Sequence, residues 1–279
     1  MSARKSRLTE VFRQADHPLL IPYAVGGYPD RDSCARILRT YAEAGAGILE
    51  IGVPFSDPLA DGPVIQAASQ VALGGGIRPA DVLGLAEEAA GTGVPVVLLS
   101  YLNTILAYGP KRFFADCGRK EVAGVVVPDV PVEEAGDLQR TARESGVDVI
   151  LLAAPTSKES RLARIAAAAS GFIYCVSTTG VTGARAALSA DLPDFVARIR
   201  RHTELPLAVG FGVSTVDQAG AVARYADGVI IGSSLVDMVE KSASVDEALP
   251  RLRSFLQKAG AAVEERRPAR RSGQQAAEE

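Results

Sequence analysis

The chain has few of the side chains on which most metal and redox sites are built. Its 279 residues include three cysteines, Cys34, Cys117 and Cys175, two histidines, His17 and His202, and no tryptophan. The cysteines match no zinc or disulfide pattern, and we expect them to be small buried side chains. Neither histidine lies near a candidate nucleophile, which argues against a histidine-based triad or metal site. Catalysis therefore has to use carboxylates, tyrosines or backbone dipoles, and no metal is expected.

Excess positive charge and long apolar runs are also absent. The formal net charge is −3, and no basic stripe lies over the part that is expected to fold. The sequence thus has no electrostatic footprint for nucleic acid. No apolar run approaches the roughly 20 residues that cross a bilayer. The N-terminus MSARKSRLTEVFRQ lacks an apolar signal core, so we predict a cytoplasmic protein.

The sequence instead alternates short apolar runs with helical patterns. Such alternation predicts a parallel sheet with crossover helices, and eight units at this length predict a single (β/α)8 TIM barrel. An open doubly wound sheet is the alternative, because periodicity does not reveal closure. The expected strands lie within residues 19–26, 48–53, 95–101, 123–129, 148–155, 171–177, 205–212 and 227–234, and the expected helices include 32–45, 131–146 and 160–171.

Both ends of the chain depart from this alternation. The segment SRLTEVFRQA places Leu8, Val11 and Phe12 on one helical face, so we predict an extra N-terminal helix that closes the barrel bottom. The C-terminal segment EERRPARRSGQQAAEE is charged and almost without apolar residues, which is typical of disorder. We therefore predict one barrel domain over residues 1–263 and a disordered tail over 264–279.

Glycine-rich stretches follow three late strands, at residues 180–184, 210–214 and 232–234. The loops after barrel strands seven and eight commonly bind phosphate, because glycine lets backbone N–H groups approach an anion. The last two stretches contain no Lys or Arg, so backbone donors and serine hydroxyls would hold the phosphate. Glycines that only form tight turns are the alternative. No complete GxGxxG or GxxxxGK[ST] motif supports nucleotide binding.

An acid lies in the second apolar run, ILEIGV. Side chains of a strand alternate between its faces, so Ile48, Glu50 and Gly52 are expected to point into the barrel, and Leu49 and Ile51 outward. Glu50 then lies toward the C-terminal end of its strand, where barrel active sites form. Burial without a partner would raise its pKa. An ion pair with a distant Lys or Arg is the structural alternative.

Residues 49–66, LEIGVPFSDPLADGPVIQ, closely resemble the signature of the tryptophan synthase alpha subunit family. GYPD, YLN, VPDVPVEE, GVTG, GFG and GSS follow strands one, three, four, six, seven and eight in the family's order, so the resemblance extends over about residues 20–238. It implies a TIM barrel that cleaves indole-3-glycerol phosphate to indole and glyceraldehyde 3-phosphate. It also implies no cofactor in this chain, and an α2β2 heterotetramer whose β subunit holds pyridoxal phosphate and consumes the indole.

The same resemblance implies roles for individual residues. Glu50 and Asp61 match the catalytic carboxylates, although spacing alone does not choose Asp61 over Asp57. Tyr174 matches a tyrosine near the reacting glycerol carbons. The remaining matches are Gly183, Gly212, Gly232 and Ser233 for the phosphate, Tyr23, Leu99 and Phe211 for the indole pocket, Thr182 for the lid, and Asp57, Asn103, Asp129 and Pro131 for the face toward the β subunit.

These residue types fit a retro-aldol cleavage. One acid has to protonate C3 of indole, and a base has to take the proton of the adjacent glycerol hydroxyl. Glu50 with a raised pKa would do both in turn. Asp61 would stay ionised, accept the indole N–H and stabilise the positive charge of the intermediate. Residues 54–63 and 178–188 are expected to be mobile lids.

Three other functions remain open at this point. A free-standing indole-3-glycerol-phosphate lyase would use the same chemistry without a β subunit. A non-catalytic paralogue would bind a sugar phosphate and activate a β-like enzyme, but it would have no use for the two acids. Another sugar-phosphate isomerase or aldolase is disfavoured, because a Schiff-base aldolase needs a lysine and none lies in a candidate strand. A metal-dependent version stays open.

Overall fold

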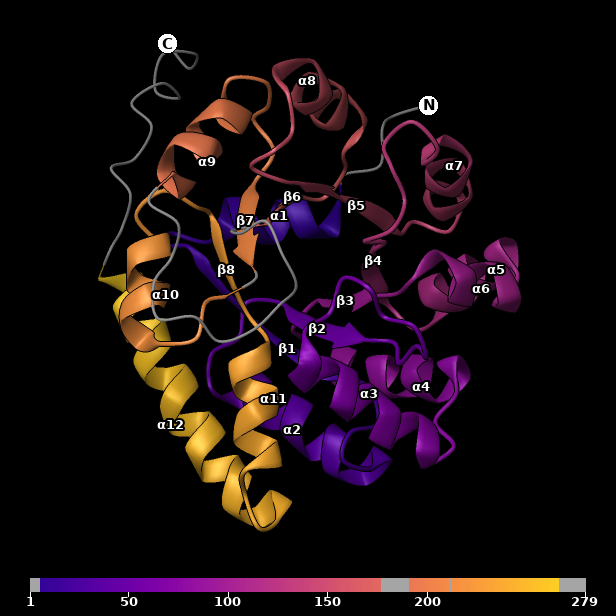
Figure 1. Ribbon diagram of the computed structural model, residues 1–279, viewed down its shortest axis with the longest axis vertical. Coiled ribbons are helices and arrows are strands. Elements are labelled where there is room, and N and C mark those ends of the chain that lie inside the picture. Colours follow the sequence, from indigo (N-terminus) through magenta and orange to yellow (C-terminus); the bar gives the residue numbers. More distant parts are fainter. Residues whose placement is uncertain (1–5, 177–190, 211, 266–279) are drawn as a thin grey trace.

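The predicted apolar runs form a closed barrel of parallel strands, paired in chain order from β1 to β8 and back to β1 (Figure 1). The computed structural model describes residues 6–176, 191–210 and 212–265. Every strand overlaps its predicted run, and the pairing of β8 with β1 confirms the closed barrel over the open sheet. The strands are β1 (Leu19–Val25), β2 (Leu49–Gly52), β3 (Val96–Leu99), β4 (Val122–Val126), β5 (Asp148–Ala153), β6 (Ile173–Val176), β7 (Leu207–Gly210) and β8 (Gly228–Ile231).

Helices cover the outside of the barrel between the strands (Figure 1). They are α1 (Arg7–Gln14), α2 (Arg31–Glu43), α3 (Pro63–Gly74), α4 (Pro79–Ala90), α5 (Leu102–Tyr108), α6 (Pro110–Arg119), α7 (Gly136–Glu144), α8 (Glu159–Ala168), α9 (Leu192–Arg200), α10 (Val216–Val222), α11 (Ser233–Glu240) and α12 (Val245–Glu264). The predicted helix over 131–146 was wrong at its start. Residues before Gly136 form turns, one of them closed by the Glu134 N–H on the Pro131 carbonyl at 2.9 Å.

Two apolar layers lie on opposite sides of the strands. Leu49 and Ile51 belong to the layer between the strands and the helices, whereas Ile48 belongs to the barrel interior. This division confirms the predicted alternation along the second strand. Glu50 shares the inward face, where its register partners are Tyr23 on β1 and Val97 on β3.

Helix α1 closes the N-terminal end of the barrel, as the sequence predicted. Leu8 is fully buried, and the Phe12 and Phe172 rings lie 5.6 Å apart between centroids. Two glycines make room for Leu8, because a Cβ on Gly124 or Gly171 would lie 2.8 or 3.1 Å from its Cδ1. The packing of α1 against the barrel therefore depends on small residues at this end of the strands as well as on the apolar face of the helix.

Polar groups at this end of the barrel are paired. The Ser6 hydroxyl donates to an Asp148 carboxylate oxygen at 2.5 Å and also accepts the Thr9 N–H at 3.1 Å, which caps α1. The Thr9 hydroxyl donates to the Gly171 carbonyl at 2.9 Å. These bonds attach the start of α1 to β5 and to the segment before β6.

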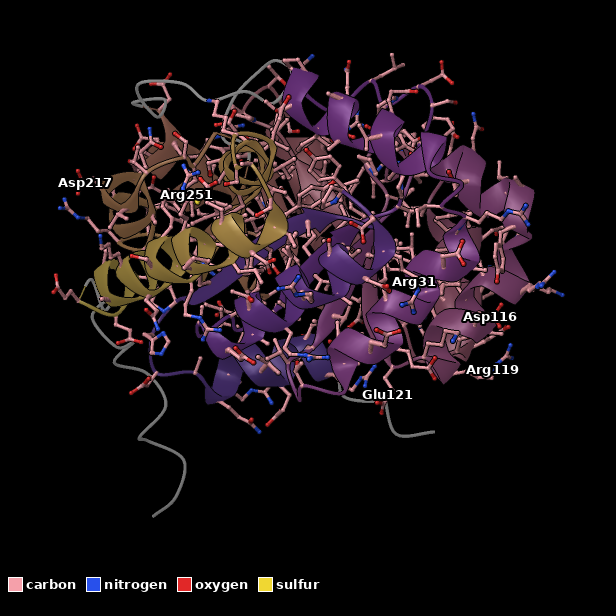
Figure 2. The ribbon with its side chains drawn as sticks, turned by 90° about the horizontal axis from the view of Figure 1, so that it is seen from below. Arg31, Asp116, Arg119, Glu121, Asp217 and Arg251 are labelled. Atoms are coloured by element: carbon pink, nitrogen blue, oxygen red, sulfur yellow. The ribbon has the colours of Figure 1, made fainter. Side chains whose placement is uncertain are left out.

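The C-terminal helix α12 packs against α10 and α2. Surface ion pairs from Arg36 to Asp246 and from Arg253 to Glu43 join it to α2. It continues to Glu264, so the first residue of the predicted tail is helical, and residues 266–279 lie outside the described part. Charged side chains such as Arg119 and Asp217 point outward at opposite edges of the molecule (Figure 2). In the described ranges no helix is long and apolar enough to span a membrane.

Candidate active site

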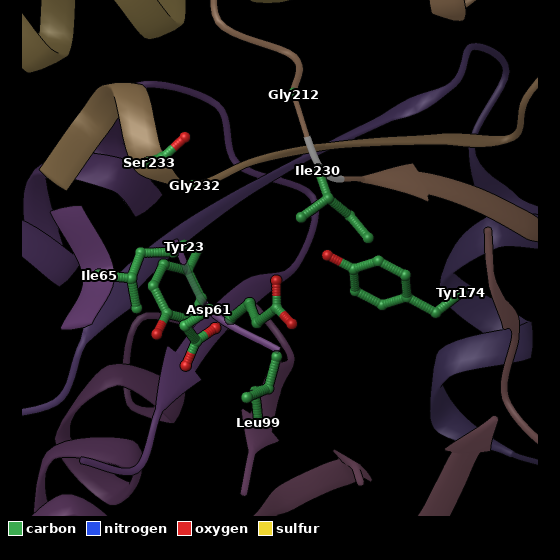
Figure 3. A pocket seen from close by; sticks show the side chains of 10 residues that line it. Tyr23, Asp61, Ile65, Leu99, Tyr174, Gly212, Ile230, Gly232 and Ser233 are labelled. Carbon is green, nitrogen blue, oxygen red and sulfur yellow. The ribbon is translucent and has the colours of Figure 1, made fainter. Parts of the chain in front are cut away.

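A cavity opens at the C-terminal end of the barrel strands, where active sites of this fold form. It holds about 400 Å³ of space, its open mouth included. Figure 3 shows Tyr23 and Asp61 on one side, Tyr174 opposite them, and Gly232 with Ser233 along one edge. The described residues that line it are Tyr23, Glu50, Asp61, Ile65, Leu99, Tyr174, Gly212, Ile230, Gly232 and Ser233. The structure thus brings together eight of the residues that the sequence singled out.

Glu50 is a buried acid with an unsatisfied carboxyl group. Its side chain is 2% exposed, and Oε1 has no hydrogen-bond partner among the described residues. No described Lys, Arg or His forms an ion pair with it, which counts against the structural alternative of a distant partner. Burial, and then the nearby charge of Asp61, raise the pKa of Glu50 to about 8. Near neutral pH this carboxyl therefore carries a proton.

Asp61 lies on the loop between β2 and α3 and is 5% exposed. The Tyr101 hydroxyl donates to Asp61 Oδ2 at 3.1 Å and accepts the Ala60 N–H at 3.0 Å. Burial raises the pKa of Asp61 to about 6, while the Tyr101 hydrogen bond opposes the rise. At pH 7 the two acids therefore hold different states, Glu50 protonated and Asp61 mostly ionised. Such a separation gives two neighbouring carboxyl groups distinct roles.

Two tyrosines stand inside the barrel and each lies over a glycine. A Cβ on Gly52 would lie 2.0 Å from the Tyr23 hydroxyl, and a Cβ on Gly210 would lie 2.3 Å from the Tyr174 hydroxyl. Each glycine therefore leaves the space that the tyrosine ring on the preceding strand occupies. Burial and the Glu50 and Asp61 charges raise the pKa of both tyrosines, so both remain neutral hydroxyls.

The opposite end of the cavity is formed by backbone. Gly212 has φ +94°, a conformation that favours glycine, and Gly232 is the N-cap of α11. The first N–H groups of a helix lack intrahelical partners and attract anions. Ser233 is buried, and the hydroxyl of Ser234 has no partner among the described residues. This end can bind a phosphate group without a formal positive charge from the described lining.

The sequence matches one protein family over nearly its whole length. The model of the family described as tryptophan synthase alpha chain covers residues 10–264. The chain belongs to the tryptophan synthase alpha chain family. The tryptophan synthase alpha chain of Roseiflexus castenholzii is 46% identical over 242 residues, which are 85% of this chain and 93% of that protein. The one from Dehalococcoides mccartyi is 42% identical over 255 residues, 90% of this chain and 98% of that one.

Solved structures agree with this family assignment. A chain of Mycobacterium tuberculosis tryptophan synthase matches with a TM-score of 0.87 and 38% identity, over 94% of this chain and 99% of that one. A tryptophan synthase alpha chain from Legionella pneumophila matches with a TM-score of 0.84 and 30% identity, over 93% of this chain and 98% of that one. The family is one of lyases in tryptophan biosynthesis.

Some residues matched to the tryptophan synthase alpha family cannot be located. Thr182, Gly183 and Phe211, as well as the predicted lid over 178–188, lie outside the described residues. The other predicted lid, residues 54–63, is described, and its side chains range from buried Asp61 to Leu59, which is 86% exposed. Whether either segment moves stays a prediction.

The four residues matched to the partner face lie on loops and helix starts that follow the strands. Asp57, Asn103 and Asp129 are exposed, and Pro131 is half-buried. Asp129 also has a local role, because both of its carboxylate oxygens accept the Leu102 N–H at the start of α5, at 2.9 and 3.2 Å.

Three residues at or beside the cavity were missed from the sequence. Ile230 belongs to the inward face of β8, which strand alternation could have indicated. Ile65 lies in the first turn of α3, and Tyr101 follows Leu99 by two residues beyond the end of β3. No local signal marks either as a neighbour of Asp61, because they approach it only when strands and loops are assembled.

Proposed function

We propose that this chain is a tryptophan synthase alpha subunit that cleaves indole-3-glycerol phosphate to indole and D-glyceraldehyde 3-phosphate. The observation that carries the proposal is the buried carboxyl of Glu50, whose Oε1 has no described partner, in one cavity with Asp61. The two acids share a cavity with the N-terminus of α11. A substrate with an indole at one end and a phosphate at the other fits this distribution of charge.

The different states of the two acids support the proton transfers. Protonated Glu50 gives its proton to C3 of the indole ring, which forms a C–H bond and leaves a positive charge on the ring. Asp61 accepts the indole N–H and stabilises that charge. The Glu50 carboxylate then takes the proton of the glycerol hydroxyl next to the ring. The carbon–carbon bond breaks, its electron pair returns to indole, and the hydroxyl carbon becomes the aldehyde.

The lining of the cavity supports this route over a Schiff-base mechanism. No lysine is among the described residues that line the cavity, and the sequence from 177 to 190 contains none either. A class I aldolase requires such a lysine. Two carboxyl groups with separated pKa values provide both the acid and the charge stabilisation, so the proposed chemistry uses neither a metal nor an organic cofactor of this chain. Pyridoxal phosphate would belong to the β partner.

Exposed apolar side chains support a protein partner at the cavity mouth. Leu59 on the loop between β2 and α3 is 86% exposed, and Leu106 on α5 is 53% exposed. They belong to the same segments as Asp57 and Asn103, which match the family's partner face. Their support for an interface therefore comes from this position in the chain beside the matched residues. We therefore include a β subunit and an α2β2 heterotetramer in the proposal. The cytoplasmic location in the proposal rests on the sequence prediction alone.

The test is indole release from indole-3-glycerol phosphate by the purified full-length chain, alone and with a tryptophan synthase β subunit. We expect slow release by the chain alone and faster release in the complex. Full turnover without acceleration would instead identify a free-standing lyase. No release under either condition, with the chain folded and bound to the β subunit, would identify a non-catalytic paralogue and refute the proposed reaction.

A further inference from the structure

We infer that Tyr101 is a positioning residue for Asp61, because its hydroxyl holds one carboxylate oxygen and leaves the other to meet the indole N–H. The inference rests on the proposed function for its kinetic consequence. Its structural part, that the Tyr101 hydroxyl orients Asp61 and favours its ionised form, does not depend on the substrate.

The first support is the hydrogen-bond geometry. The Tyr101 hydroxyl donates to Asp61 Oδ2 at 3.1 Å, and no described residue bonds Oδ1. Tyr101 is 3% exposed and burial raises its pKa, so the hydroxyl keeps its proton and acts as a donor. A hydrogen bond to a charged acceptor in a buried place is among the stronger ones. It therefore restricts the rotation of the carboxylate and leaves Oδ1 as the free acceptor.

The second support is how Tyr101 is itself held. Its ring stacks on Phe55, with centroids 5.1 Å apart and planes at 29°. Its hydroxyl oxygen accepts the Ala60 N–H at 3.0 Å. Phe55, Ala60 and Asp61 all belong to the loop after β2, whereas Tyr101 follows β3. The Tyr101 side chain thus contacts the loop at Phe55 and at Ala60, and it orients the carboxylate of the next residue, Asp61.

The third support is the charge around Asp61. In the described ranges no cation pairs with it, so its negative charge is stabilised mainly by hydrogen bonding. The titratable groups that face the pair are Glu50 on β2, Tyr23 on β1, Tyr174 on β6 and, on the Tyr101 side, Asp129 after β4. None of them carries a positive charge. Loss of the Tyr101 hydroxyl would therefore favour protonation of Asp61, which can then no longer stabilise the cationic intermediate.

The experiment compares Tyr101→Phe with a matched control, Tyr108→Phe. Both changes remove one hydroxyl that donates to an aspartate, since Tyr108 donates to Asp116 at 2.7 Å. Asp116 lies on α6 with Arg119 at one edge of the molecule (Figure 2), and neither residue lines the cavity. The Phe ring keeps the stack on Phe55, so Tyr101→Phe is expected to fold.

The first measurement is a ¹³C NMR titration of the Asp61 carboxyl in the full chain. It is made in the Glu50→Gln background, so that the coupled titration of Glu50 does not distort the midpoint. We expect Tyr101→Phe to move the Asp61 midpoint to higher pH, and Tyr108→Phe to leave it unchanged. If Tyr101→Phe does not fold, the Tyr101 Cζ resonance of the parent chain must still titrate with the Asp61 midpoint. The inference would be overturned if the Asp61 midpoint were unchanged in Tyr101→Phe. It would also be overturned if the Tyr101 Cζ chemical shift did not change over the pH range in which Asp61 titrates.

The second measurement is kinetic. We expect Tyr101→Phe to lower kcat about 10-fold, the size of a lost hydrogen bond to a charged group, with little change in KM. The acid limb of its pH–rate profile should also move to higher pH. The same 10-fold loss in an Asp61→Asn background would contradict action through Asp61. If the parent chain releases no indole, the proposed function fails, and the NMR titration still decides whether Tyr101 orients Asp61.

Discussion

The two ends of the barrel differ in whether a buried or half-buried carboxyl group has a hydrogen-bond partner. At the closed end Asp148 accepts the Ser6 hydroxyl, and α1 covers the floor with Leu8 and Phe12. At the open end Glu50 is buried more deeply than Asp148, and its Oε1 has no described partner. A paired polar group stabilises the fold, whereas an unpaired one costs stability and acquires a shifted pKa. The paired carboxyl at the closed end therefore adds to stability, whereas the unpaired one at the open end reduces it and holds its proton to higher pH.

The largest expected effect comes from replacing the unpaired acid at the open end, Glu50. Glu50→Gln keeps the shape of the side chain and removes its proton chemistry, so indole release should fall by about 10²–10⁴-fold, the range for general acid–base catalysis. Asp148→Asn makes the same acid-to-amide change at the closed end. It should leave kcat unchanged at temperatures where the chain is folded. If Glu50→Gln kept activity within a few-fold of the parent, the assignment of Glu50 would be wrong.

The next effect is on stability at the closed end. Leu8→Ala removes a fully buried side chain from the floor of the barrel. The unfolding free energy should fall by about 3–5 kcal/mol, as for other large-to-small changes in tightly packed cores. Chemical denaturation measures this, and kcat below the unfolding temperature serves as the control. A loss below 1 kcal/mol would show that α1 is not part of the core.

The third effect is a dependence of folding stability on pH that is caused by the unpaired Glu50. The Glu50 pKa rises from 4.5 in the unfolded chain to about 8 in the folded one. Between these values the folded chain keeps a proton that the unfolded chain releases, so this group lowers stability as pH rises from about 4.5 to 8. At pH 8, Glu50→Gln should therefore be more stable than the parent by roughly 2–4 kcal/mol, and at pH 4 about equal to it. Equal stability at both pH values would mean that Glu50 is not desolvated.

The smallest effect concerns the helix cap at the closed end. Ser6→Ala removes the N-cap of α1 and the bond to Asp148, which should lower the unfolding free energy by about 1–2 kcal/mol. Thermal unfolding at pH 7 measures the change. Activity should not respond, because Ser6 lies at the end opposite the cavity. A fall in kcat of the folded variant would show that the two ends are coupled.

The barrel was predictable because its signals are local and repeated. Each strand is a short apolar run, and the helix of Leu8, Val11 and Phe12 shows its buried face within one segment. The extent of the helices was less predictable. The start at Gly136 was missed, because turns before a helix can carry helix-forming residues.

The residues of the cavity were predictable where strand alternation or the family resemblance pointed to them. Alternation placed Glu50 inside the barrel, and resemblance selected Asp61 over Asp57, which the structure leaves exposed. Tyr101 was not found, because its contact with Asp61 joins residues 40 positions apart on different loops. Thr182, Gly183 and Phe211 keep their predicted roles as predictions.

The sequence by itself determined that Glu50 faces the barrel interior, because the two-residue period of a strand turns alternate side chains to opposite faces. It did not determine that Glu50 would lack a partner, or that Asp61 would have Tyr101. Those facts depend on which side chains from separate strands and loops meet in the cavity. Only the closed barrel sets these distances, and the difference between the Glu50 and Asp61 carboxyl groups follows from them.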